Sequence, residues 1–168
     1  MNPVALLGSG PSINKTDLHA FQMPFISIND SWRFWPNEST RVFIDWHLQG
    51  GPCPARCVYP EDGSVKRPLP WACDMIPVPW RIRDGRKPKF NGFNLDQGTD
   101  AAFGGMLALE YAVWIGHNPI YLLGFDCVGA HSYSDTKIIS SKTLSTWRTL
   151  LEESLVVCKE RGIDVIQP

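Results

Sequence analysis

The first twelve residues place the strongest constraint on the fold of this chain. The apolar run Val4–Leu7 is too short for a helix and stops at a glycine, which is typical of a buried strand. The segment Gly8-Ser9-Gly10-Pro11-Ser12 follows, in which glycine permits a tight turn and proline suits the first turn of a helix. A strand, a glycine loop and a helix start predict an α/β fold with a phosphate-attracting helix end.

This loop has two readings at the level of sequence. Any tight connection from a strand to a helix uses glycine, and Gly8-Ser9-Gly10 lacks the third glycine of the dinucleotide-binding fingerprint. No Gly-Lys-Ser or Gly-Lys-Thr follows it, so it is not a Walker loop. A nucleotide site and a purely structural turn are both open at this point.

The rest of the chain alternates between strand and helix patterns. Strands are expected over residues 25–28, 41–46, 119–126 and 163–166, and helices over 13–21, over 141–161, and from an N-cap at Thr99-Asp100 to Ile115. This alternation predicts one three-layer, Rossmann-like α/β domain over residues 1–168. Its mostly parallel sheet should contain about five strands in the order 3-2-1-4-5.

Residues 47–94 interrupt this pattern with eight prolines, which exclude a long helix. We expect an irregular insertion that folds over the ligand edge of the sheet, with short strands near residues 57–59 and 75–78. His47, Cys53, Cys57 and Cys73 could hold a structural zinc ion there, although reduced thiols are the simpler account.

Composition narrows the class of protein. The chain of 168 residues has 43% hydrophobic residues and a net charge of −1, so no general basic field points to nucleic acid as a partner. No apolar segment reaches the length of a membrane span, no cationic leader precedes the first apolar run, and the five cysteines are an odd number. We therefore expect a cytoplasmic protein, and the compact size fits a phage or prophage gene.

The expected strand order brings distant residues to one edge. The switch point lies between the first and fourth strands, where parallel sheets bind ligands at the carboxyl ends of their strands. The predicted nucleotide-binding residues at this edge are Gly8, Ser9, Gly10, Pro11, Ser12, Asn29, Asp45, Gly124 and Asp126.

Three segments carry a resemblance to a known family. Gly8-Ser9-Gly10-Pro11-Ser12, Ser27-Ile28-Asn29 and residues 112–126 together resemble the bacterial sialyltransferases of glycosyltransferase family 42. The Gly-Pro-Ser loop and the later strand ending in Gly124-Phe125-Asp126 are also similar to archaeal proteins of the 6-hydroxymethylpterin diphosphokinase type.

The first resemblance implies transfer of a sugar from a CMP-type donor to a sugar acceptor without a metal or other cofactor. It implies that Tyr133 hydrogen-bonds the departing phosphate, and His131 is the nearest substitute for the general base of that family, with Asp135 beside it. The chain departs from the family at Ser9, where an asparagine is expected, at Val128, where a second tyrosine is expected, and at residues 137–144, which contain no histidine.

Two other functions stay open. A pyrophosphokinase acting on ATP and a pterin-like alcohol would need Mg²⁺ held by carboxylates such as Asp45 and Asp126. A nucleotide-binding protein without catalysis would bind CMP or ATP without hydrolysis or transfer. Metal dependence separates the first from a sialyltransferase-like enzyme.

Overall fold

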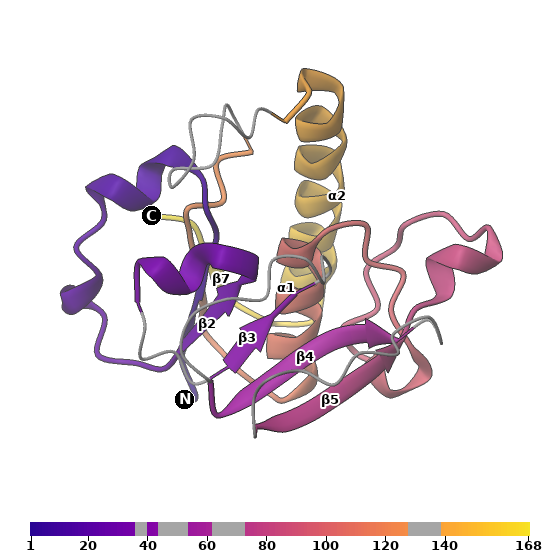
Figure 1. Ribbon diagram of the computed structural model, residues 1–168, viewed down its shortest axis with the longest axis horizontal. Helices are drawn as coiled ribbons and strands as arrows, with labels where there is room; N and C mark the ends of the chain where they lie inside the picture. The colour runs from indigo at the N-terminus through magenta and orange to yellow at the C-terminus, as the bar shows by residue number, and fades with distance from the viewer. Residues whose placement is uncertain (36–39, 44–53, 62–72, 128–138) are drawn as a thin grey trace.

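The computed structural model describes residues 1–35, 40–43, 54–61, 73–127 and 139–168. In these residues seven parallel strands form one sheet in the order β5-β4-β3-β2-β1-β6-β7 (Figure 1). The strands are β1 (Val4–Leu7), β2 (Phe25–Ile28), β3 (Thr40–Val42), β4 (Arg56–Glu61), β5 (Asp74–Pro79), β6 (Ile120–Leu123) and β7 (Val165–Ile166). The predicted α/β class, the parallel sheet and the order of its five central strands are confirmed.

Two α-helices and several short 3-10 helices flank the sheet. The α-helices are α1 (Gly104–Trp114) and α2 (Ser141–Glu160), which contact each other. The 3-10 helices are η1 (Pro11–Lys15), η2 (Leu18–Ala20), η3 (Asn29–Arg33), η5 (Arg81–Asp84) and η6 (Leu95–Gln97). None of the helices in the described ranges combines the length and apolar character that crossing a bilayer requires.

The alternation of side chains along the strands creates two apolar layers. Val4 and Leu6 of β1 pack in the layer that contains α1 and the inner side of α2. Ala5 and Leu7 pack in a smaller layer with Ile13 and Leu18 of the 3-10 helices. Because both faces of β1 are covered, all four of its residues are buried, as the continuous apolar run predicts.

The proline-rich insertion differs from its expected arrangement. The two short strands that the sequence predicts are present, but β4 and β5 extend the sheet beyond β3, so it has seven strands rather than about five. Pro77 and Pro79 lie on β5, at the edge of the sheet. An edge strand tolerates proline because alternate N–H groups have no neighbouring strand to bond.

Two expected helix boundaries are also wrong. Residues 13–21 form parts of two 3-10 helices rather than one helix, because Asp17 accepts a hydrogen bond from His19 N and starts a new turn. The N-cap of α1 is Phe103 rather than Thr99 or Asp100. The side chains of Thr99 and Asp100 instead bond to Glu110 and Arg81, so the backbone stays non-helical there. The predicted α2 boundaries agree closely with Ser140 as N-cap and Arg161 as C-cap.

Candidate functional site

A pocket opens at the carboxyl ends of β1, β2 and β6, at the switch point of the sheet. Its space is about 610 Å³ when the open solvent at its mouth is included. Within the described residues, it is lined by Gly8, Ser9, Gly10, Ile28, Asn29, Phe103, Gly104, Gly105, Gly124, Phe125, Cys127, Ile139, Leu144 and Trp147. None of these side chains carries a formal charge at neutral pH, so the described wall is neutral.

The floor of the pocket is two backbone segments held against each other. Gly8 N donates to Leu123 O at 2.7 Å, and Gly10 N donates to Gly124 O at 2.8 Å. A Cβ atom added at Gly8 would lie 2.4 Å from Gly124 O, and one at Gly10 would lie 2.7 Å from the same oxygen. Both positions require glycine because the loop after β1 touches the backbone after β6.

The side chain of Asp126 also binds the loop that follows β1. Its Oδ2 atom accepts a hydrogen bond from Ser12 N at 2.8 Å, in the first turn of η1. It therefore satisfies one of the N–H groups that a helix start leaves open. The N–H groups of Gly8, Gly10 and Ser12 are thus all bonded within the protein, which gives the Gly-Ser-Gly-Pro-Ser loop a structural role in addition to any contact with a ligand.

A second helix end faces the same pocket. Gly104 and Gly105 form the first turn of α1, and their N–H groups donate to no atom of the described residues. A Cβ atom at Gly104 would lie 2.7 Å from Ile28 Cγ2, and one at Gly105 would lie 2.9 Å from Phe125 Cε1. The close packing that these glycines predict is confirmed, and it leaves two amide groups at the positive end of α1 directed toward the pocket.

The rest of the described lining is largely apolar and aromatic. Trp147 of α2 stacks on Phe103, with ring centroids 5.2 Å apart and an angle of 20° between the planes. Leu144 lies one turn earlier on the same face of α2, and Ile139 precedes the helix. The lining of the pocket thus combines backbone amides with aromatic rings, a combination that suits a ligand with a planar group and a polar one.

Two strained residues stand at the lip of the pocket. Asn29 has φ of 51° and Cys127 has φ of 49°, and among the described non-glycine residues they alone adopt positive φ. Both line the pocket. Burial raises the pKa of the Cys127 thiol, which the positive charge of Arg148 partly opposes. Strain of this kind concentrates at binding and catalytic sites, where the surrounding structure holds it in place.

Ser31 holds the backbone next to Asn29 in place. Its buried hydroxyl accepts a hydrogen bond from Ile28 N at 2.7 Å and donates one to Leu7 O. This hydroxyl joins the ends of β1 and β2 immediately before the chain turns at Asn29. A buried polar contact therefore fixes the backbone directly before Asn29.

The structure brings together five of the predicted nucleotide-binding residues, namely Gly8, Ser9, Gly10, Asn29 and Gly124. Ser12 and Asp126 lie next to them and bond to each other, and Pro11 begins η1 beside the pocket. Asp45 and the three residues predicted to act in catalysis, His131, Tyr133 and Asp135, lie outside the described residues.

Sequence reasoning missed most of the apolar wall. Leu144 and Trp147 were expected only as the inward face of the last helix, because their spacing is that of a core-facing stripe. The paired glycines at 104 and 105 were the one usable signal, since glycine in a first helical turn indicates a close approach. Nothing in the local pattern distinguishes Phe103 or Phe125 from ordinary core residues.

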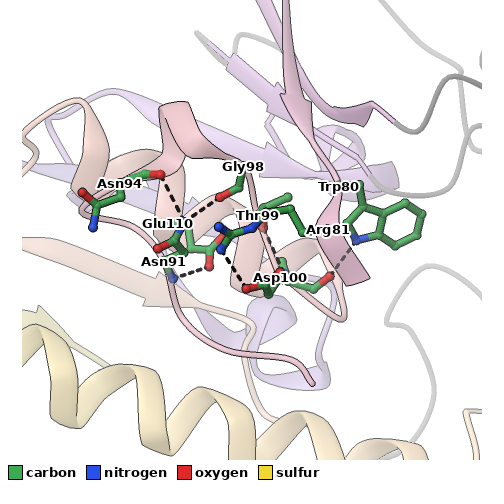
Figure 2. A network of polar contacts seen from close by, with 9 residues as sticks. Trp80, Arg81, Asn91, Asn94, Gly98, Thr99, Asp100 and Glu110 are labelled. Atoms are coloured by element: carbon green, nitrogen blue, oxygen red, sulfur yellow. Dashed lines mark hydrogen bonds and ion pairs between the residues drawn. The ribbon is translucent and has the colours of Figure 1, made fainter. Parts of the chain in front are cut away.

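A separate polar network holds the chain between β5 and α1 (Figure 2). Glu110 is fully buried on α1; its Oε1 accepts from Asn91 N at 2.6 Å, and its Oε2 accepts from the Thr99 hydroxyl. Burial raises the pKa of Glu110 to about 7, although these two hydrogen bonds act in the opposite direction. Arg81 and Asp100 form an ion pair at 2.8 Å nearby. The network pins residues 80–101 to the central helix.

The zinc hypothesis involves residues on both sides of a gap in the described structure. Cys57 and Cys73 lie close together, with 3.4 Å between their sulfur atoms. His47 and Cys53 lie outside the described residues. Among the residues that are described, no three histidine, cysteine, aspartate or glutamate side chains gather in a way that could hold a metal ion.

Comparison with known proteins leaves the family open, because no family model matches the chain and no curated protein matches it at significant similarity. The resemblance to the sialyltransferases therefore stays a hypothesis, and the pocket is the starting point for any statement about function.

Proposed function

We propose that this protein binds a CMP-type nucleotide sugar in the switch-point pocket. In a sialyltransferase-like reaction it transfers the sugar from this donor to an acceptor hydroxyl. One observation carries the proposal: the three segments that resemble that family, although far apart in sequence, meet in one pocket. Gly8–Gly10, Ile28–Asn29 and Gly124–Phe125 each contribute to its lining. Convergence of separate motifs on one cavity is the expected behaviour of a ligand site.

The described lining suits a nucleoside monophosphate better than a magnesium-bound triphosphate. The two amides of Gly104 and Gly105 can donate to a phosphate at the end of α1, and Asn29 can hydrogen-bond a base or a ribose. Magnesium prefers carboxylate oxygens, and none lines the described part of the pocket. Asp126, one of the carboxylates considered for Mg²⁺, accepts a hydrogen bond from Ser12 N instead.

In the proposed reaction an acceptor hydroxyl attacks the anomeric carbon of the sugar as the bond from that carbon to the CMP phosphate breaks. His131 takes the proton of the hydroxyl, and Tyr133 donates a hydrogen bond to the departing phosphate. Asp135 orients the acceptor or the ribose. In the sequence these three residues follow Cys127, which lines the pocket.

Ligand binding is the first test. Thermal-shift titrations with CMP, UDP, GDP and ATP, each with and without Mg²⁺, should give the largest stabilisation with CMP and no dependence on Mg²⁺. Asn29→Gly removes the amide side chain while keeping positive φ accessible, so it should abolish the shift without adding backbone strain. Asn94→Ala changes an exposed asparagine outside the pocket lining and serves as the matched control.

Turnover is the second test. His131→Ala should abolish transfer from CMP-sialic acid while leaving CMP affinity nearly unchanged. Unchanged turnover would remove His131 from the mechanism. A stabilisation by ATP that requires Mg²⁺ would favour the pyrophosphokinase, and tight CMP binding without transfer by the wild type would favour a binding protein without catalysis.

A further inference from the structure

Three sulfur atoms lie close together at the edge of the sheet formed by β4 and β5, away from the strands that border the pocket. Cys57 is on β4, Cys73 precedes β5 and Met75 is on β5. Cys73 Sγ lies 3.4 Å from Cys57 Sγ and 3.6 Å from Met75 Sδ. Cys57 and Met75 are register partners in the parallel pair, and Cys73 is two residues before Met75. All three side chains therefore share one face of the sheet.

The spacing of these sulfur atoms is closer to that of metal ligands than to that of a disulfide. A disulfide needs about 2.05 Å between its sulfur atoms, far less than the 3.4 Å that separates Cys57 and Cys73. Metal–thiolate bonds of about 2.3 Å place the sulfur ligands of one ion about 3.7–4.0 Å apart. The two measured contacts of Cys73 Sγ, with Cys57 Sγ and with Met75 Sδ, need to lengthen by only a few tenths of an ångström to reach this spacing.

The donor set selects the kind of ion. The donor atoms that the described contacts bring together here are two thiols and a thioether, all of them soft ligands. Zinc sites are built from thiolate, imidazole and carboxylate, whereas thioether sulfur is a preferred ligand of monovalent copper. We propose that Cys57, Cys73 and Met75 form a binding site for one Cu(I) ion.

The burial of the cluster fits this role. Cys57 is fully buried and forms the inner side of the site, while Cys73 and Met75 are half-buried and leave a path for the ion. Binding replaces the protons of two thiols by one Cu(I), so two protons are released and the copper keeps its oxidation state. Met75 adds a neutral third ligand. Affinity should therefore rise with pH.

This site is independent of the proposed transfer reaction. Cys57 is the second residue of β4 and Cys73 immediately precedes β5, so the cluster lies toward the amino ends of these strands. The pocket lies at the carboxyl ends of β1, β2 and β6. Loss of copper binding therefore leaves the nucleotide proposal intact, and loss of nucleotide binding leaves the copper proposal intact.

A competition titration tests the site. Fully reduced protein is titrated anaerobically with Cu(I) in the presence of a chromogenic Cu(I) chelator, and one equivalent should be withdrawn from the chelator. Cys73→Ser should weaken binding by about 100-fold or more, and Met75→Leu, which keeps the volume, by about tenfold. Cys158→Ser removes a buried thiol on α2, away from the cluster, and should leave the affinity unchanged.

Three results would overturn the proposal. The first is an affinity for Cu(I) that is the same in the wild type, Cys73→Ser and Met75→Leu. The second is an equal loss in Cys158→Ser, which would indicate binding by scattered thiols. The third is the displacement of Cu(I) by Zn(II), together with an affinity for Zn(II) that is the same in Met75→Leu and in the wild type. Circular dichroism and urea unfolding of each variant establish that the compared proteins are folded.

Discussion

The carboxylate of Asp126 is bonded to the backbone of Ser12, 114 residues earlier in the chain, at 2.8 Å. This contact joins the loop after β1 to the loop after β6 at the switch point of the sheet. A carboxylate at the start of a helix is favourable both as a hydrogen-bond acceptor and as a charge beside the positive helix end. Asp126, which the sequence predicts as a ligand-binding residue, therefore binds the loop that follows β1.

Replacing Asp126 should reveal this structural role. Asp126→Ala leaves Ser12 N without its acceptor, so the free energy of unfolding should fall by about 1–3 kcal/mol, as for other hydrogen bonds to charged groups. Urea unfolding measures the change. Asp96→Ala, at an exposed position in η6, is the control and should alter stability by less than about 0.5 kcal/mol. Equal stability of the two variants would contradict the assignment.

The glycine at position 10 should be intolerant of any side chain for a steric reason. Its φ of −69° is open to every residue, but an added Cβ would lie 2.3 Å from Asp126 Oδ2 and 2.7 Å from Gly124 O. Gly10→Ala should lower stability by about 2–3 kcal/mol because a backbone carbonyl must move. Gly162→Ala is the contrast: it meets no neighbour but has φ of 72°, so it should cost only about 1 kcal/mol. The reverse order in urea unfolding would be inconsistent with this contact.

Glu110 should make stability depend on pH. Its pKa is raised to about 7, so the folded protein holds the proton more tightly than the unfolded chain does. The resulting stabilisation is complete below about pH 4.5 and is lost as the pH rises through 7. A rise in pKa of this size corresponds to about 3 kcal/mol.

Urea unfolding between pH 4.5 and 8 measures this effect. As the pH rises, the free energy of unfolding of the wild type should fall by up to about 3 kcal/mol relative to that of Glu110→Gln, because glutamine does not ionise. The exposed Glu160→Gln is the control and should follow the wild type throughout. A constant difference between wild type and Glu110→Gln would show that Glu110 keeps an ordinary pKa.

The stack of Trp147 on Phe103 should support the wall of the pocket. Trp147→Ala removes a half-buried ring whose centroid lies 5.2 Å from its partner, and should lower stability by about 2–3 kcal/mol. Trp114→Ala, at the end of α1 where the side chain is 42% exposed, should cost less than about 1 kcal/mol. Thermal unfolding compares the two, and similar midpoints would argue against a packed aromatic wall.

The local sequence predicted correctly those features that depend only on periodicity or on the backbone conformation of a single residue. The run Val4–Leu7 is a strand buried on both faces, and Gly116 and Gly162 follow the two α-helices with φ of 85° and 72°. The stripe that includes Trp147, Leu151 and Cys158 is the inner face of α2, as its spacing predicts. These features depend on periodicity and backbone conformation, which neighbouring residues express directly.

The expectations that were wrong depend on contacts made at a distance. The two strands expected within residues 47–94 are present, but the sequence did not indicate that they would add to the sheet beyond β3 and raise its strand count. Thr99 has the properties of an N-cap, but its hydroxyl donates a hydrogen bond to Glu110, which lies 11 residues later in the chain. A side chain with two possible partners takes the one that the fold brings near, and local sequence does not contain that information.

The amino-acid sequence by itself determined the α/β class and the glycine positions at the switch point, because periodicity and backbone freedom are local properties. The order of the five expected strands followed from the usual strand order of Rossmann-like folds. Only the tertiary structure decided how those residues are used. It bonded Asp126 to Ser12, placed Gly104, Gly105 and Trp147 in the lining of one pocket, and brought Cys73 Sγ close to Cys57 Sγ and Met75 Sδ. Each of these depends on chain segments that meet through packing of the sheet and helices, so the three-dimensional fold alone specifies them.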